Sequence, residues 1–362
     1  MHITLIAGAR PNFMKIAPVI AEIKRKKTQG IDIDYRLVHT GQHYDEKMSA
    51  SFFHQLNIPE PDANLNCGGG SQAEQTAAIM VAFEKYLSQN PTDLVVVVGD
   101  VTSTMACAIV AQKNHTKVAH IEGGIRSGDW TMPEEINRLV TDSISNYFFT
   151  TSEVANHNLL QSGVRKENIF FVGNTMIDTL KQNQSRFIKP DFYNKEELSP
   201  QNYLVLTLHR PANVDDPEIL HQLLDEILNN TANLKLVFPV HPRTRKVLDQ
   251  LHVNNSRLFV CEPLPYLEFN YLVQHSRAVI TDSGGITEET TVMGIPCMTL
   301  RNSTERPETC TVGTNELLGT NPKNIKPALE KLMAGNWKKG NIPKLWDGKT
   351  AERIIAELLK LK

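Results

Sequence analysis

Leu94 to Asp100 read LVVVVGD, five consecutive apolar residues followed by a glycine and a carboxylate. An unbroken Leu/Val run flanked by turn residues is typical of a parallel strand buried on both faces of a sheet. Amphipathic segments such as Ala17–Lys26, Ala73–Leu87 and Ile219–Leu228 are typical of helices. They alternate with further apolar runs: Ile3–Ala7, Tyr35–His39, Val118–Ile121, Tyr147–Phe149, Ile169–Val172, Tyr203–Leu208, Leu234–Val240, Arg257–Val260, Ala278–Thr281 and Pro296–Leu300. The alternation predicts βαβ units and an α/β fold.

The apolar runs fall into two halves, and a length of 362 residues favours two domains. The stretch Lys181–Pro200 is polar and shows no strand pattern, so it predicts a hinge and linker. We expect a Rossmann-like domain over residues 1–175 and a second over residues 176–349. Both should be doubly wound and face a central cleft. The last helix, within residues 350–362, is expected to pack on the first domain.

The composition is that of an ordinary globular protein, with 41% hydrophobic residues, 22% charged residues and a formal net charge of -2. Basic and acidic residues are interspersed, and we interpret the one basic cluster, Lys24–Lys27, as the solvated end of a helix. No segment approaches the roughly 18 apolar residues of a membrane span, and the first residues show no signal-peptide pattern. The sequence predicts a cytoplasmic protein that binds neither nucleic acid nor membrane.

The cysteines are scattered and form no C-x-x-C pair. Such a set in a long chain favours reduced, mostly buried thiols over a disulfide framework or a zinc site. The five are Cys67, Cys107, Cys261, Cys297 and Cys310. We therefore expect no metal site, and we also expect no cofactor, since the chain lacks the glycine motifs of nicotinamide and P-loop proteins.

Polar residues follow the carboxyl ends of many predicted strands, which is where open parallel sheets bind ligands. In the first half they are Arg10, Lys15, Gln42, His43, Asp100 and Glu122; in the second half they are His209, Arg210, His241, Arg243, Asp282 to Gly285 and Arg306. Two sheets with polar residues at this edge predict one ligand site shared by the two domains.

The segment TDSGGITEE, Thr281 to Glu289, predicts a strand end, a glycine turn and a helix start. Backbone N–H groups and the helix dipole at such a start favour a phosphate. We expect Glu288 and Glu289 in the first turn, where one could accept hydrogen bonds from a ribose. The alternative is a tight turn whose acidic residues only complement the helix dipole.

Arg10 and Lys15 follow the first strand, where a dinucleotide fold would carry its glycine fingerprint. The chain has neither G-x-G-x-x-G at this point nor a P-loop motif, which disfavours nicotinamide and P-loop chemistry. An Arg and a Lys at a strand end can neutralise a diphosphate. An ordinary surface pair is the alternative.

Three carboxylates are candidates for one cleft. Asp100 and Glu122 each end a strongly apolar strand, where a carboxylate is costly unless it is paired or used. Glu134 opens the helix of MPEEINR, but this motif by itself is structural more often than not, as a salt bridge to Arg138 one turn later. Three histidines are interpreted as structural: His39, His120 and His275.

Eight segments together make the sequence recognisable. They are GARPNFMKIAPV, HTGQHYDEKMS, VVGDVTSTMACA, HIEGGIRSGDWTMPEEINR, VGNTMIDTL, LHRPANVDD, TDSGGITEE and STERPET. From Ile3 to about Gly319 the chain resembles the non-hydrolysing UDP-N-acetylglucosamine 2-epimerases. The resemblance implies the fold of the B-type glycosyltransferases, a UDP-sugar in the cleft between the domains and a homodimer.

The resemblance also implies roles for individual residues. Asp100, Glu122 and Glu134 match the family's catalytic carboxylates, and His209 matches its active-site histidine. The substrate-binding matches are Arg10, Lys15, Ser283, Gly284 and Gly285 for the diphosphate, Glu289 for the ribose, Phe269 for the uracil, and Arg138 and Arg306 for the sugar and phosphate pocket. His241 joins them by its position after a strand.

Some positions depart from the family pattern. Asn12 and Tyr44 stand where many bacterial members carry Glu and Arg, and Ala212 replaces a Glu. The loop Gly128–Pro133 is also shorter than in many relatives. Several bacterial members bind a second UDP-sugar near these segments as an activator. These departures argue against such activation in this chain, and they leave the expected reaction unchanged.

Carbon 2 of the sugar carries nitrogen, so oxidation of a carbinol at that carbon is unavailable. We expect proton removal from carbon 2 with loss of UDP to give 2-acetamidoglucal, after which UDP adds back as a proton arrives at carbon 2 from the opposite face. The alternatives are a 2-epimerase of another UDP-2-acetamido sugar, a hydrolysing epimerase, a glycosyltransferase, or a UDP-sugar sensor without catalysis. The TERPE sequence favours the glucosamine substrate.

Overall fold

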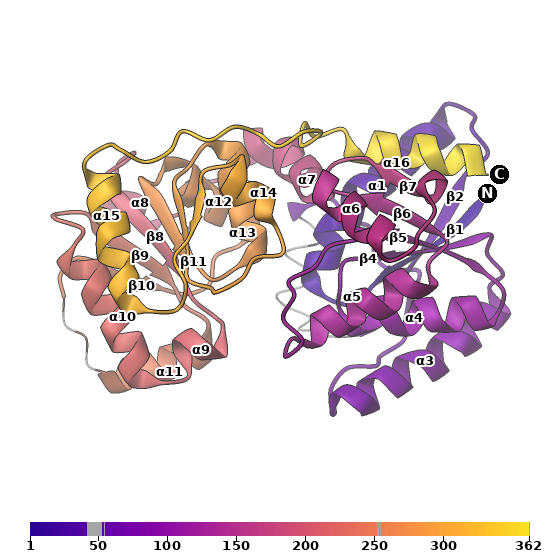
Figure 1. Ribbon diagram of the computed structural model, residues 1–362, viewed down its shortest axis with the longest axis horizontal. Coiled ribbons are helices and arrows are strands. Elements are labelled where there is room, and N and C mark those ends of the chain that lie inside the picture. Colours follow the sequence, from indigo (N-terminus) through magenta and orange to yellow (C-terminus); the bar gives the residue numbers. More distant parts are fainter. Residues whose placement is uncertain (42–52, 54, 252, 254, 362) are drawn as a thin grey trace. The chain divides into compact units, whose positions relative to one another are not determined.

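The computed structural model describes residues 1–41, 53, 55–251, 253 and 255–361. The chain divides into two compact units (Figure 1). Unit 1 comprises Met1–Gln182 together with Lys344–Lys362, and unit 2 comprises Asn183–Pro343. All five cysteines lie in described segments and are free thiols. No helix in the described residues is long and apolar enough to cross a membrane.

Unit 1 contains a seven-stranded sheet in the order β3-β2-β1-β4-β5-β6-β7, with all its neighbouring strands parallel. Its strands are β1 (His2–Ala7), β2 (Asp34–His39), β3 (Ala63–Asn64), β4 (Leu94–Val98), β5 (Lys117–Ile121), β6 (Tyr147–Thr150) and β7 (Ile169–Phe171). Its helices are α1 (Arg10–Thr28), α3 (Gln72–Gln89), α4 (Thr102–Lys113), α5 (Pro133–Ile144), α6 (Glu153–Gln161), η1 (Lys166–Asn168), α7 (Thr175–Asn183), α16 (Thr350–Leu358) and η4 (Leu359–Leu361). The order makes β1, β4 and β5 neighbours at the centre.

The C-terminal segment returns to unit 1, where α16 lies against α1 (Figure 1). The Asp178 carboxylate accepts the backbone N–H groups of Thr350 and Ala351 at 3.0 and 2.7 Å, at the start of α16. Trp346 is fully buried just before this helix, and its Nε1 donates to the Thr151 carbonyl. Trp346 and Asp178 therefore hold the C-terminal segment on unit 1.

Unit 2 contains a six-stranded parallel sheet in the order β10-β9-β8-β11-β12-β13. Its strands are β8 (Tyr203–Thr207), β9 (Lys235–Pro239), β10 (Leu258–Cys261), β11 (Ala278–Thr281), β12 (Cys297–Thr299) and β13 (Asn315–Leu317). Its helices are η2 (Gln184–Arg186), α8 (Phe192–Lys195), α9 (Pro211–Val214), α10 (Pro217–Asn229), α11 (Pro242–Leu251), α12 (Tyr266–His275), α13 (Gly284–Met293), α14 (Pro307–Thr311), η3 (Pro322–Asn324) and α15 (Ile325–Met333). Leu204, Leu206 and Ile280 face a core that also contains Leu220, Leu224 and Ile227 of α10.

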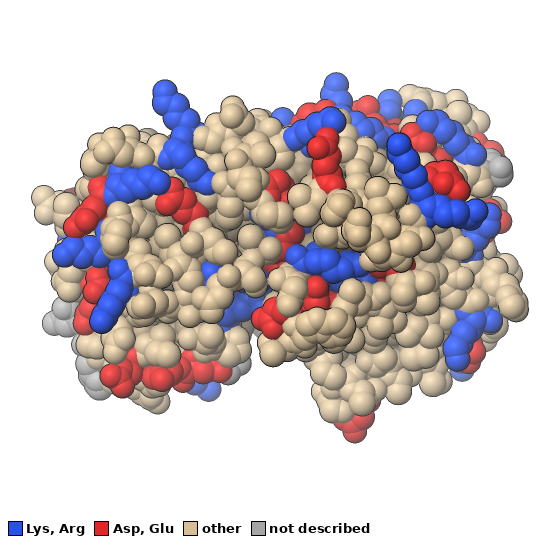
Figure 2. All heavy atoms as spheres, in the orientation of Figure 1, with Lys and Arg blue, Asp and Glu red and all other residues tan. Residues whose placement is uncertain are grey.

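The predicted α/β class with two Rossmann-like sheets is confirmed, and every strand predicted from an apolar run is present. Two short edge strands, β3 and β13, were not predicted, since each has only two or three residues, among them an asparagine, and so leaves no apolar run to detect. The basic cluster lies in the last turns of α1, where Arg25 and Lys26 pair with Glu22. On the face drawn in Figure 2, Lys and Arg side chains are interspersed with Asp and Glu.

Candidate active site

Three turns meet at the carboxyl edge of the unit 1 sheet, because the strands that precede them are neighbours. Arg10 opens α1 just after β1 and is exposed. Asp100 follows β4, and Glu122 follows β5. The β1-β4-β5 order therefore brings the predicted cation and two of the predicted carboxylates to one edge.

Lys15 and Glu122 form a buried ion pair in unit 1. Lys15 Nζ lies 2.7 Å from Glu122 Oε2, and the two side chains are 13% and 3% exposed. Glu122 has a φ of 71°, a left-handed conformation that is uncommon for a residue with a side chain. Gly99 leaves room for the pair, because a Cβ there would lie 3.1 Å from Lys15 Nζ. The turn geometry thus serves to place one carboxylate against one ammonium group.

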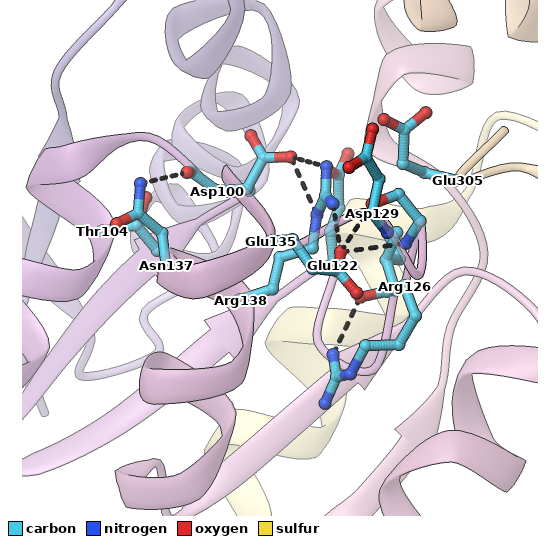
Figure 3. Close-up of polar contacts among 12 residues, drawn as sticks. Asp100, Thr104, Glu122, Arg126, Asp129, Glu135, Asn137, Arg138 and Glu305 are labelled. Carbon is cyan, nitrogen blue, oxygen red and sulfur yellow. Dashed lines mark hydrogen bonds and ion pairs between the residues drawn. The ribbon is translucent and has the colours of Figure 1, made fainter. Parts of the chain in front are cut away.

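Arg138 joins two carboxylates (Figure 3). Its Nε and Nη2 both donate to Asp100 Oδ2, at 3.0 and 2.5 Å, and its Nη1 donates to Glu135 Oε2 at 2.6 Å. Burial alone would raise the pKa of Glu135, but hydrogen bonds from the Ser127 N–H, from Arg138 and from the Gly128 N–H lower it. Glu135 thus stabilises the loop that precedes α5 and orients the arginine that binds Asp100.

Glu134 is different from the other two predicted carboxylates. It is partly exposed in the first turn of α5, and within the described part of the chain it has no hydrogen-bond or ion-pair partner. The salt bridge considered from the sequence, between Glu134 and Arg138, is not the one observed, because helix phase turns the neighbouring Glu135 toward Arg138. Glu134 therefore carries a carboxylate in the first turn of α5 that is bonded to none of the described residues.

A buried network underlies the turns after β4 and β5. His120 is fully buried, with Nδ1 2.7 Å from Asp142 Oδ1 and Nε2 2.8 Å from the Gly99 carbonyl. Asp142 also accepts from the Gly124 N–H at 3.0 Å and from Arg126 at 2.6 Å. These bonds support the interpretation of His120 as a structural residue. The bonds from His120 and Arg126 lower the pKa of Asp142, although burial alone would raise it.

Asn12, one of the departures from the family pattern, has a structural role. Its Oδ1 accepts the N–H groups of Gly8 and Ala9 at 3.1 and 3.0 Å, and its Nδ2 donates to the Val98 carbonyl at 3.0 Å. It is buried and ties the β1 turn to β4. Ala212 is exposed on α9. The predictions for Gln42, His43 and Tyr44 lie outside the described residues.

In unit 2 the predicted strand end, turn and helix start of TDSGGITEE are observed. β11 ends at Thr281 and α13 begins at Gly284, with Ser283 as its N-cap. The Ser283 side chain makes no capping hydrogen bond, and Ser283, Gly284 and Gly285 are partly exposed. The helix start is therefore open to an anion.

Glu288 and Glu289 lie beyond the first turn of α13, so the expectation that they lie in it was wrong. Both are buried. Tyr266 Oη donates to Glu289 Oε1 at 2.8 Å. Burial raises the pKa of Glu289 to about 7. Phe269 lies one turn further along α12, partly exposed.

Two arginines of the RNSTERPE segment are paired within unit 2. Arg306 donates through Nε to Glu288, and both side chains are buried. Arg301 binds Glu305 through two hydrogen bonds, at 2.9 and 2.7 Å. The sequence singled out both Arg306 and Glu288 but did not predict their pairing, because which carboxylate Arg306 meets depends on how α13 packs beside this loop. The Arg306–Glu288 pair anchors the loop to α13, and the Arg301–Glu305 pair lies within the loop.

The turn after β8 places His209 beside β11. His209 Nδ1 lies 2.6 Å from Asp282 Oδ1, and its side chain is 55% exposed while that of Asp282 is fully buried. His241 is exposed after β9, directly before α11. No group of three or more His, Cys, Asp or Glu side chains in residues 1–41, 53, 55–251, 253 and 255–361 could hold a metal ion.

Two parallel-sheet units with polar strand ends define the two-domain α/β fold of the B-type glycosyltransferases. MurG of Acinetobacter baumannii shares that fold, with a TM-score of 0.55 at 10% identity over 99% of both chains. A model of the UDP-N-acetylglucosamine 2-epimerase family matches residues 24–359. The chain belongs to this family.

Relatives of different names are almost equally similar to this chain. The UDP-N-acetylglucosamine 2-epimerase of Methanocaldococcus jannaschii is 40% identical over 370 residues, which cover 98% of each chain. The UDP-2,3-diacetamido-2,3-dideoxy-D-glucuronate 2-epimerase of Pseudomonas aeruginosa is 39% identical over 324 residues, 88% of each chain. The crystal structure of the M. jannaschii enzyme in complex with UDP-GlcNAc and UDP aligns with a TM-score of 0.87 at 39% identity, over 99% of this chain and 100% of that one.

Proposed function

We propose that this protein interconverts UDP-N-acetylglucosamine and UDP-N-acetylmannosamine by inverting carbon 2 without net hydrolysis. The observation that carries the proposal is the pair of strand-end carboxylates, Asp100 and Glu122, each bonded to a cation at one sheet edge. The full-length similarity to the M. jannaschii enzyme, whose crystal complex contains UDP-GlcNAc and UDP, supports the choice of substrate.

The binding roles divide between the units. In unit 2, the Ser283–Gly285 helix start would bind the diphosphate through backbone N–H groups, and His209 would donate to it. Glu289 would accept from the ribose and Phe269 would stack on the uracil, while His241 and Arg306 complete that unit's contribution. In unit 1, Arg10 and Lys15 would meet the diphosphate charge, and Arg138 would line the sugar pocket.

The reaction would proceed by elimination and return. A carboxylate takes the proton from carbon 2, the bond from carbon 1 to the diphosphate oxygen breaks, and its electron pair leaves with UDP. The product of this half is 2-acetamidoglucal. UDP then adds back to carbon 1 while a second group delivers a proton to the opposite face of carbon 2. Asp100, Glu122 and Glu134 supply more than one group for this exchange.

The environments of the carboxylates suit different tasks. Arg138 holds Asp100 and Lys15 holds Glu122 by hydrogen bonds, which fixes where each carboxylate would meet the sugar. Glu134, without a partner among the described residues, is free to exchange a proton with the sugar. We therefore assign all three to proton transfer at carbon 2.

A second substrate has specific support, because the P. aeruginosa relative is nearly as similar as the M. jannaschii one. The chain would then epimerise a UDP-2-acetamido sugar with further substituents. Incubation with each UDP-sugar, followed by identification of the product by NMR, tests both proposals. A UDP-N-acetylmannosamine signal from UDP-N-acetylglucosamine supports the first. Free N-acetylmannosamine would instead indicate a hydrolysing enzyme, and no turnover of any UDP-sugar would indicate a binding protein without catalysis.

The homodimer stays a prediction, which light scattering of the purified protein checks.

A further inference from the structure

Asp282 makes an unusually complete set of hydrogen bonds at the end of β11. Its Oδ2 accepts the backbone N–H of Arg210 at 2.9 Å and the Asn213 side-chain amide at 2.9 Å. The His209 N–H lies 3.2 and 3.1 Å from its two oxygens. His209 Nδ1 completes the set at 2.6 Å from Oδ1. The carboxylate is fully buried, yet these bonds lower its pKa against the effect of burial.

The ionised carboxylate of Asp282 determines which nitrogen of the His209 ring carries a proton. A carboxylate only accepts hydrogen bonds, so Nδ1 of His209 must carry the proton in that contact. The other nitrogen, Nε2, is then the ring atom left for a ligand, on a side chain that is 55% exposed. A buried acid that orients a histidine in this way fixes both its tautomer and its direction.

The register of the sheet places this imidazole next to the helix start. β8 and β11 are paired with Thr207 opposite Thr281. His209 and Ser283 each follow that pair by two residues, so they leave the sheet at the same edge. The start of α13 and His209 can therefore face the same anion.

We propose that Asp282 is a positioning residue for catalysis: it keeps a proton on Nδ1 of His209 and directs Nε2 at the departing diphosphate, to which the ring donates once Nε2 has also taken up a proton. The proposal rests on the proposed function, in which His209 donates to that diphosphate. Its competitor is a purely structural role, in which Asp282 only fastens the turn from His209 to Asn213.

Three variants separate the two roles. Asp282→Asn keeps the size of the side chain but can no longer accept every bond, so it should lower kcat by roughly 10²–10⁴-fold, with a much smaller change in UDP affinity. Asn213→Ala removes a turn contact without touching the imidazole and should retain kcat within a few-fold. The double variant His209→Asn with Asp282→Asn should have the same kcat as His209→Asn alone, because Asp282 would act only through His209.

A spectroscopic measurement needs no turnover. The ¹⁵N shifts of the His209 ring at neutral pH should show a protonated Nδ1 in the natural protein, assigned by the loss of the signal in His209→Asn. In Asp282→Asn the tautomer population should shift toward protonated Nε2. Unchanged shifts in Asp282→Asn, additive losses in the double variant, or an Asn213→Ala variant as impaired as Asp282→Asn would each overturn the positioning role. Absence of epimerisation in the natural protein, with the expected ring shifts, would overturn the proposed function instead and leave the orientation of His209 standing.

Discussion

Lys15 Nζ and Glu122 Oε2 lie 2.7 Å apart, although 107 residues separate them in the chain. Lys15 comes from α1 and Glu122 from the turn after β5, so the contact depends on the strand order that places β4 between β1 and β5. Removing one partner of a buried ion pair leaves the other charge uncompensated, which costs more than removing both.

The first prediction therefore concerns stability. Lys15→Met should lower the free energy of unfolding by about 3–5 kcal/mol, because it leaves the Glu122 carboxylate buried without its ammonium partner. The double variant Lys15→Met with Glu122→Gln should recover part of that loss. Thermal or urea unfolding of both variants checks this, with circular dichroism confirming that each folds. A double variant less stable than the single one would contradict the pairing.

The second prediction concerns pH. The pKa of Glu289 is raised to about 7 in the folded protein from an ordinary value of 4.5. As pH rises from 4.5 to about 7, the unfolded chain releases this proton first, so stability falls by about 3 kcal/mol over this window and then levels. Glu289→Gln should remove that fall, so its stability relative to the natural protein should improve with rising pH.

The measurement is the melting temperature at pH values between 4.5 and 8. Glu330→Gln, at an exposed position of the same unit, is the matched control and should follow the natural protein throughout. Parallel curves for Glu289→Gln and the natural protein would show that the Glu289 proton does not affect folding.

The third prediction concerns the diphosphate. A Cβ at Gly284 would meet Glu305 Oε2 at 3.7 Å and Arg301 Nη1 at 3.8 Å, which are ordinary contacts, so the fold has space for a side chain. Gly284→Val should therefore fold, yet abolish UDP binding, because its methyl groups cover the open helix start. Gly284→Ala should show a smaller loss. Calorimetric titration with UDP measures both, and an unchanged affinity in a folded valine variant would move the phosphate site elsewhere.

The fourth prediction concerns the chemistry. Product formed in heavy water should carry one deuterium at carbon 2, since the substrate proton is exchanged during elimination and return. Asp100→Asn, Glu122→Gln and Glu134→Gln should each lower the rate by roughly 10²–10⁴-fold. UDP affinity should change much less, because these groups are assigned to the sugar.

Variants impaired in returning the proton should release UDP and 2-acetamidoglucal, which mass spectrometry detects. Product that retains the substrate hydrogen at carbon 2 would rule out this mechanism. Full activity of all three variants would remove the carboxylates from it, even if the epimerase activity itself were observed.

Several pairings in the site were not predictable from sequence. The choice of Glu135 rather than Glu134 as the partner of Arg138 depends on where α5 begins and on how Arg138 is turned toward Asp100. Asp142 lies one helical turn after Arg138, a spacing that could have drawn attention to it. Its partners His120 and Arg126, however, belong to β5 and to the following loop. Neighbouring residues in sequence thus face different elements, and only packing decides which.

Sequence by itself determined the class of fold and the sheet edge at which the candidate residues lie. Continuous apolar runs such as LVVVVGD must be buried on both faces, and the polar residue that follows each run leaves the sheet at its carboxyl end. The tertiary structure alone decided the charge partners, Lys15 with Glu122, Arg138 with Asp100, and His209 with Asp282. The physical reason is that burial along a strand is a local property of the chain, whereas an ion pair requires two distant segments to be brought within about 3 Å by strand order and helix packing.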